Sequence, residues 1–328
     1  MFHKTVLTAA LLLPALGLHA QKGIGKPEDI KLVRSLPLVV VMEKENPRKV
    51  KKLTKRSPEE LASYRKAVAT RNESLKTQVQ KYWKLSPDLQ FKTSGEIDSL
   101  VKNTPQIYST LRLFDYLDVK QHRGIGADGL VSNESQDITM SANTRCTLRL
   151  QLRGKGRSEN QSVGWANIDH TRIHESDISF SVREIQDYLD NCSKGQKTPD
   201  MTAESKANAS RLKEKTLLLD EEDARENLSL ADISACYPYP VKLVERSVIE
   251  EAVQSADARY ACVRLVPTSS SGAVYMVAHL VMSTDTGDIL AYSTPFLKPI
   301  LLIGKNANSG FEVGKATLSD FARCAAGK

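Results

Sequence analysis

The sequence predicts an α/β (α+β) protein with two related domains, each built on a small mixed β-sheet with packed helices. Three observations support this fold class. Short β-branched runs alternate with segments of helical periodicity, the same order of elements occurs twice, and side chains of matching chemistry recur 152 residues apart. Alternating strands and helices favour right-handed parallel crossovers, while a late hairpin in each half adds an antiparallel part. Each half is therefore expected to run β-α-β-α-β-β-β-α, with the strand order 2-1-3-4-5.

The N-terminus has the three parts of a secretory signal peptide. A short basic lead precedes an apolar run from Thr5 to Leu18, and Ala20 offers a small residue at the cleavage edge. This run is shorter than the roughly 20 residues with which a helix spans a bilayer. Residues 1–20 are therefore predicted to be a signal peptide and residues 21–30 a polar leader. We expect the mature protein to be periplasmic or secreted, without a transmembrane span.

The first α/β domain is predicted over residues 31–192. Its first strand is the continuous apolar run LPLVVVM at 36–42, a pattern typical of a strand buried on both faces. The sequence Ser57-Pro58-Glu59-Glu60 supplies an N-cap, a proline at the first helical position and a glutamate at the third, and so opens a long helix over 57–85. The remaining expected elements are a strand at 89–93, a helix at 95–103, a strand at 108–114, a hairpin of strands 145–152 and 162–168, and a helix from Ser181 to Cys192.

A linker and a second domain follow. Residues 193–215 are rich in Lys, Ser, Asn, Thr and Gly and have no apolar face, which is typical of a linker. The second α/β domain is then predicted over residues 216–328. Its expected elements are strands 216–219, 241–244 and 260–266, a helix at 247–256 opened by a Ser247/Glu250 capping box, a hairpin of 274–282 and 288–293, and a helix at 317–325.

Matching residues support an internal repeat. At a shift of 152 positions, Tyr108 meets Tyr260 and Arg112 meets Arg264, and several apolar positions around them also agree. Convergence on a common strand-helix-strand pattern explains the apolar matches but explains the Tyr and Arg matches less easily. The correspondence therefore predicts a duplication, with the long helix at 57–85 as an insertion in the first copy.

Charge and cysteine content limit the classes of partner. The formal net charge of +7 in an exported protein favours anionic partners such as polysaccharide, phospholipid headgroups or cell-wall polymer, and the aromatic content of 6% argues against a nucleic-acid stacking platform. An odd number of cysteines leaves at least one thiol outside any intramolecular disulfide, and no spacing resembles a zinc site. Buried thiols and bridges both remain open for Cys146, Cys192, Cys236, Cys262 and Cys324.

Three segments match part of a catalytic or cofactor motif but lack its context. Residues 124–129 spell GxGxxG without a preceding strand or a following helical face, so we interpret them as a flexible glycine loop. The surrounding GIGADGL also resembles a loop of diaminopimelate epimerases, a family whose paired cysteines include a Cys-Gly-Asn-Gly context that this chain lacks. Asp285-Thr286-Gly287 has the core of the aspartic protease signature, but between two strands it predicts a hairpin turn. Residues 310–315 (GFEVGK) fall short of a phosphate loop.

Histidine positions give no firm site. His170 and His174 are four residues apart, with Asp169, Glu175 and Asp177 nearby, but the HExxH spelling is absent and the segment connects a strand to a helix. A solvated polar loop is the expected structure, and no metal or cofactor is predicted. A hydrolase with scattered Ser, His and Asp residues remains an alternative, although no GxSxG elbow is present.

One basic segment carries the functional prediction. Six cations occur in nine residues directly before the helix at 57–85, where they oppose its macrodipole, so local stability does not explain them. The alternatives are a solvated connector and an anion-binding segment. We therefore expect a non-enzymatic binding or assembly module that docks on an anionic envelope surface or another envelope protein through Arg48, Lys49, Lys51, Lys52, Lys55 and Arg56. Catalytic residues and the oligomeric state are not predicted.

Overall fold

The computed structural model describes residues 26–117, 144–154, 162–168, 173–195, 206–225, 227–270, 274–293, 296–299 and 312–327. The predictions made for the signal peptide, the glycine loop at 124–129 and His170 lie outside these residues. Within this part of the chain, no helix combines the length and apolarity needed to cross a membrane.

The first unit, residues 27–195, is built on a five-stranded mixed sheet in the predicted order 2-1-3-4-5. Strand β1 pairs in parallel with β2 and β3, and β4 and β5 continue the sheet as antiparallel neighbours. The strands are β1 (Leu38–Met42), β2 (Leu89–Thr93), β3 (Tyr108–Leu117), β4 (Thr144–Arg153) and β5 (Ser162–Ile168). The helices are α1 (Pro27–Ser35), α2 (Pro47–Arg56), α3 (Pro58–Tyr82), α4 (Ser94–Asn103) and α6 (Glu175–Ser193).

The second unit, residues 206–327, repeats this strand order. Strand β6 pairs in parallel with β7 and β8, and β9 and β10 complete the five-strand path, while the short β11 pairs with the other end of β9. The strands are β6 (Thr216–Asp220), β7 (Val241–Val244), β8 (Tyr260–Ser270), β9 (Val274–Ser283), β10 (Ile289–Tyr292) and β11 (Phe296–Pro299). The helices are the 3-10 helix η1 (Ala209–Lys213), α8 (Leu230–Cys236), α9 (Arg246–Gln254) and α10 (Lys315–Ala325).

The two sheets share their register as well as their strand order. Leu38 of β1 lies opposite both Leu89 and Ser109, and Leu217 of β6 lies opposite both Val241 and Ala261. Leu89 and Val241 are 152 positions apart, as are Ser109 and Ala261, which is the shift found in the sequence. The prediction of two α/β units of one topology is thus confirmed; a duplication as its origin stays a prediction.

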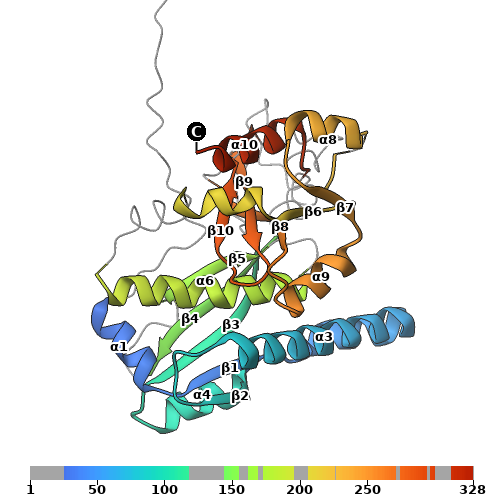
Figure 1. The fold of residues 1–328 in the computed structure, drawn as a ribbon. Coiled ribbons are helices and arrows are strands. Elements are labelled where there is room, and N and C mark those ends of the chain that lie inside the picture. The colour runs from blue at the N-terminus through green and yellow to red at the C-terminus, as the bar shows by residue number, and fades with distance from the viewer. Residues whose placement is uncertain are drawn as a thin grey trace, which may run out of the picture.

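Helix α6 lies between the two sheets and is buried by both (Figure 1). Ile178, Val182 and Ile185 join the core beneath the first sheet, together with residues of α1 and α3. Phe180, on another side of the helix, joins the core formed by the second sheet and α9. Because residues 176–185 are all buried, α6 resembles a helix in the centre of a large core more than a surface helix with one apolar stripe.

The outer faces of the two sheets are covered by smaller elements. Helix α4 packs on β1 and β2 through a small core around Ile97. On the second sheet, η1, α8 and α10 cover the face turned away from α6, where Leu318 and Phe321 are fully buried. The molecule is therefore layered (Figure 1). In succession come α4, the first sheet, the helix layer that contains α6, the second sheet, and the layer of α8 and α10.

Two predicted capping boxes are wrong. Helix α6 begins at Glu175, capped by His174 and Asp177, so Ser181 lies inside the helix and its hydroxyl accepts a hydrogen bond from Arg264 instead. Helix α9 begins at Arg246 without a side-chain cap, and Glu250 accepts hydrogen bonds from Ser176 of α6. Ser181 and Glu250, which the sequence suggested as capping residues, thus form hydrogen bonds across the interface between the units. Local sequence does not show such a contact.

Several elements have no counterpart in the sequence prediction. Helix α1 covers part of the predicted polar leader and buries Ile30 and Val33 in the first core. Residues 206–215, at the end of the predicted linker, include η1 and bury Leu212 in the second core. Helices α2 and α8 and strand β11 also appear only in the structure. All five cysteines are among the described residues and none of them is in a disulfide.

Candidate functional site

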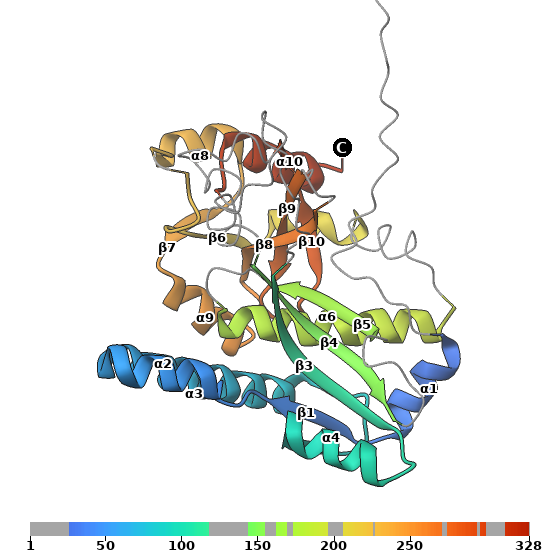
Figure 2. The same ribbon diagram turned by 180° about the vertical axis from the view of Figure 1, so that it is seen from behind.

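The predicted basic segment forms helix α2, which packs along α3 to make a helical arm (Figure 2). We define the arm as residues 47–67, that is α2 and the first part of α3. Over this stretch only Leu53 is buried. At about 1.5 Å per residue, the 25-residue α3 is about 37 Å long, and its N-terminal part extends from the body of the first unit with α2 beside it.

Local contacts hold the arm in shape. The Asn46 side chain accepts hydrogen bonds from the backbone amides of Arg48 and Lys49, at 3.0 and 3.3 Å, and Pro47 takes the first helical position. The Asn46 amide donates to the Tyr64 hydroxyl at 2.8 Å, and the Lys49 ammonium lies 4.4 Å from the centre of the Tyr64 ring. The hairpin is therefore fixed at both the cap and the ring, without needing a large apolar interface.

Ser57 joins the two helices of the arm. Its side chain accepts a hydrogen bond from the Glu60 amide at 3.2 Å, which confirms the predicted N-cap of α3. Its backbone amide bonds to the Leu53 carbonyl, which ends α2. One residue thus closes the first helix and opens the second, so the chain reverses in a tight corner.

The six predicted binding residues lie on one side of α2. At 100° per residue, they span an arc of about 160°, while Val50 and Leu53 occupy the opposite side, toward α3. All six are exposed. Lys55 and Arg56 lie in the last turn, where a cation is favourable to the dipole of α2 itself. The structure therefore brings together, as one charged face, Arg48, Lys49, Lys51, Lys52, Lys55 and Arg56.

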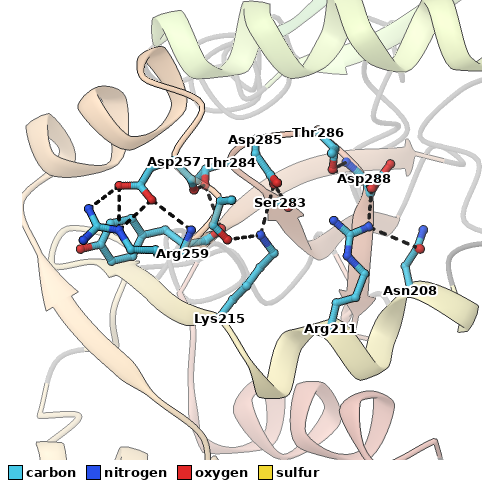
Figure 3. Close-up of polar contacts among 12 residues, drawn as sticks. Asn208, Arg211, Lys215, Asp257, Arg259, Ser283, Thr284, Asp285, Thr286 and Asp288 are labelled. Carbon is cyan, nitrogen blue, oxygen red and sulfur yellow. Dashed lines mark hydrogen bonds and ion pairs between the residues drawn. The ribbon is translucent and has the colours of Figure 1, made fainter.

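A second polar cluster surrounds the turn between β9 and β10 (Figure 3). Lys215, just before β6, lies 3.2 Å from an Asp285 oxygen and also donates to the Ala258 carbonyl. Arg211 of η1 lies 2.5 Å from Asp288. The Ser283 hydroxyl donates to Asp285 as well, and although burial alone would raise the pKa of this carboxyl, the bonds from Ser283 and Lys215 lower it to about 2.

The place of this cluster in the fold indicates a structural role. It gathers at the N-terminal ends of β6 and β8, whereas ligands of open α/β sheets bind at the C-terminal ends of the parallel strands. Asp285 remains ionised and paired with Lys215, so this carboxyl is not poised to exchange a proton near neutral pH. The cluster fixes the hairpin and η1 to the start of the second sheet.

The Asp-Thr-Gly segment is a hairpin turn, as predicted. It connects β9 to β10, and Gly287 has a φ of +79°, which favours glycine. The Arg183 side chain of α6 packs against this glycine and donates to the Asp285 carbonyl at 2.9 Å. The turn therefore also forms part of the interface between the units.

His174, Glu175 and Asp177 belong to the start of helix α6 and not to a solvated loop, while Asp169 lies outside the described residues. His174 caps the helix and Asp177 occupies its third position, nearly buried. Glu175 accepts from Gln78 of α3 and Gln254 of α9, at 3.5 and 2.5 Å. Throughout the described ranges, no group of three or more His, Cys, Asp or Glu side chains is arranged to hold a metal ion.

One Ser–His pair is relevant to the hydrolase alternative. His279 Nδ1 lies 3.1 Å from the Ser293 hydroxyl, but the two residues are only 3% and 2% exposed. Burial lowers the pKa of His279 to about 4, which makes its neutral form a weak base. The pair is part of the packing between β9 and β10.

Trp83 and Trp165 differ in their surroundings. Trp83 is buried in the first core. Trp165 is half-buried on β5 and belongs to none of the apolar clusters formed by the described residues.

Comparison with known proteins assigns no family to this chain, so its function is inferred from its own residues. No protein-family model, no curated protein and no solved structure matches this chain.

Proposed function

We propose that the protein is an exported binding or assembly module that docks on an anionic surface of the cell envelope through the basic face of its helical arm. The observation that carries the proposal is the segregation of six exposed cations on one side of a preformed helix. Such a face concentrates like charges, which repel one another, and isolated surface ion pairs do little to offset that repulsion. An anionic surface supplies many opposite charges at once.

The distribution of charge supports a directed attachment. The second unit, residues 206–327, carries 15 acidic and 13 basic side chains, a net charge of −2, whereas the first unit, residues 27–195, carries 22 acidic and 28 basic side chains, a net charge of +6. The positive charge is therefore concentrated in the first unit, and an anionic surface would attract the arm and repel the second unit. The protein would dock with the second unit held away from the surface.

The contact is electrostatic and does not insert into a bilayer. Because Leu53 and Val50 face α3, α2 has no apolar side available for an acyl layer. Each basic residue close to an anionic lipid surface contributes about 1 kcal/mol, and this attraction is screened beyond about 8 Å at physiological ionic strength. Binding should therefore weaken steeply as salt is added.

Co-sedimentation with vesicles tests the proposal. The mature chain is mixed with vesicles of phosphatidylcholine, with or without 30 mol% phosphatidylglycerol (a composition of about one anionic lipid in three, enough for surface attraction), at low and high salt. We expect it to pellet only with anionic vesicles at low salt. Changing Lys49, Lys51, Lys52 and Lys55 to Gln should abolish pelleting.

A matched variant distinguishes the effect of charge in the arm from the effect of the protein's net charge. Four exposed lysines outside the arm are changed to Gln, so that the same charge is lost elsewhere: Lys31, Lys102, Lys194 and Lys206. This control should pellet like the native protein. If both variants lose binding equally, net charge and not the arm is responsible; if neither does, α2 is only a solvated helix.

A further inference from the structure

A second charged surface lies on the face of the first sheet that carries α4. Arg112 of β3, Arg149 of β4 and Trp165 of β5 lie opposite one another across three neighbouring strands. Phe114 follows on the same face, two residues beyond Arg112. All four side chains are half-buried. We call these residues, Arg112, Phe114, Arg149 and Trp165, the arginine–aromatic patch.

The aromatic rings of this patch lie outside the apolar cores. Arg112 lies opposite Arg149, whose Nε also donates to the Thr147 hydroxyl at 3.0 Å. Their guanidinium groups lie 4.7 and 5.0 Å from the centre of the Phe114 ring, so the ring is placed between two cations. Neither Phe114 nor Trp165 belongs to any apolar cluster of the described residues.

The equivalent surface of the second unit binds a helix. At the shift of 152, Arg112 corresponds to Arg264, which lies on the face of the second sheet that receives α6. Arg264 donates to Glu184 at 2.9 Å and lies 3.8 Å from Asp177, both on α6. Phe180 of the same helix packs on this face beside Cys262.

Helix α6 therefore presents two carboxylates and an adjacent aromatic ring to a single arginine, Arg264. In α6 these groups occupy positions i, i+3 and i+7, for Asp177, Phe180 and Glu184. Residues at this spacing share one side of a helix. The second unit thus shows how this kind of sheet face recognises a helix.

Within the described chain, the first sheet has no helix at the equivalent place. Helix α4 packs on β1 and β2, and Figure 2 shows β3, β4 and β5 with no described helix in front of them. Where the second sheet has Leu280 opposite Arg264, the first has Arg149 opposite Arg112. The first sheet thus has two opposed arginines where the second sheet has one arginine opposite a leucine.

We propose that the arginine–aromatic patch binds an acidic α-helix of a protein partner, in the position that α6 takes on the second sheet. The partner helix carries two carboxylates one or two turns apart, with an aromatic or aliphatic side chain between them on the same side. The carboxylates pair with Arg112, as Glu184 and Asp177 pair with Arg264, and Trp165 and Phe114 supply the apolar contact. Arginine and aromatic side chains are also the residue types that dominate binding energy at protein interfaces.

A synthetic peptide provides the probe. The acidic peptide is an amphipathic helix with Asp, Phe and Glu at the spacing of Asp177, Phe180 and Glu184, and its control has Asn and Gln in place of the two acids. Fluorescence anisotropy with the mature chain should show the acidic peptide binding about tenfold more tightly, a difference of about 1.4 kcal/mol. Failure of the acidic peptide to bind, or equal affinity for both peptides, would overturn the proposal.

Variants locate the contact. Arg112→Gln should weaken binding of the acidic peptide about tenfold, Arg112→Lys should weaken it less, and the exposed Arg323→Gln on α10 should leave it unchanged. The four-lysine arm variant should bind the peptide normally and fail only with vesicles, so the two surfaces are distinguished. Circular dichroism checks that each variant is folded. Binding by Arg112→Gln with native affinity, while folded, contradicts the assignment.

Discussion

Two arginines at matching positions of the two sheets have different surroundings. Arg112 and Arg264 match in sequence and occupy the same position on their sheets. Arg264 is 3% exposed and donates to Glu184, Ser181 and the Asn167 carbonyl, at 2.9, 2.7 and 2.8 Å. Arg112 stacks on Phe114. The sequence equates the two residues, but only the packing of α6 decides which one is enclosed.

Replacing Arg264 tests its place between the units. Arg264→Met should lower the free energy of unfolding by about 3–5 kcal/mol, because Glu184 and Asp177 lose a cation inside a nearly dry interface. Arg259→Gln is the control, since the Arg259 side chain is 77% exposed and its pair with Asp257 is local. Urea unfolding measures both. A loss of less than 1 kcal/mol for Arg264→Met would show that Arg264 does not stabilise the buried carboxylates of Glu184 and Asp177.

His279 gives the stability a pH dependence. Its folded pKa of about 4 lies below the ordinary value of 6.5, because burial disfavours the imidazolium. The unfolded chain therefore binds a proton between pH 6.5 and 4 that the folded chain does not. The stability that depends on neutral His279 is complete above pH 6.5 and falls by roughly 3 kcal/mol as the pH drops to 4.

The variant His279→Asn isolates this effect. Urea unfolding of the native chain and the variant at pH 7, 5.5 and 4 should give stability curves that converge as the pH falls, because Asn cannot take up the proton. A constant difference between the two curves would mean that the pKa of His279 is the same in the folded and the unfolded chain.

At the scale of single elements, helices and strands with regular sequence patterns could be predicted, whereas the contacts that polar residues make between elements could not. The buried strand β1, the capped helix α3 and both hairpins agree with the sequence prediction. Helix α2 was missed because it has one buried residue in ten and depends on Asn46 and Tyr64 for its position. The start of α6 was misplaced because Ser181 and Glu184 mimic a cap while serving Arg264.

Gly287 tests the turn that contacts α6. Gly287→Ala should destabilise the protein by roughly 2–4 kcal/mol, because the residue has a left-handed φ and a Cβ there would lie 2.6 Å from the Arg183 Cδ. Gly195→Ala is the matched control, with a φ of +77° and no atom within 4 Å of the new Cβ. It should cost about 1 kcal/mol. If Gly287→Ala and Gly195→Ala lose the same amount of thermal stability, the Arg183 side chain moves away from the new Cβ at no cost.

At the scale of the whole molecule, the strand order and the repeated topology could be predicted, but the shared helix could not. Nothing in the α6 sequence distinguishes a helix covered on one side from one buried between two sheets, except that Phe180 lies away from the stripe of Ile178, Val182 and Ile185. The arginine–aromatic patch was also missed, because the register of β3 against β4 depends on pairing over a long connection.

The shared helix predicts how the units respond to a cut between them. With a specific protease site placed within residues 196–205, the cleaved halves should still elute as one complex, because Arg264, Phe180 and Gly287 hold α6 in the second unit. Adding Arg264→Met should weaken this association. Two stable fragments that separate on size exclusion would show instead that the predicted linker divides two independent domains.

Binding to purified envelope tests the docking of the arm most directly. Native protein, the variant with Lys49, Lys51, Lys52 and Lys55 changed to Gln, and the variant with the same number of lysines changed outside the arm are each sedimented with envelope at low and high salt. The native protein and the matched control should pellet at low salt and be released at high salt, while the arm variant stays in the supernatant. An arm variant that pellets with the native protein at low salt would contradict docking through α2.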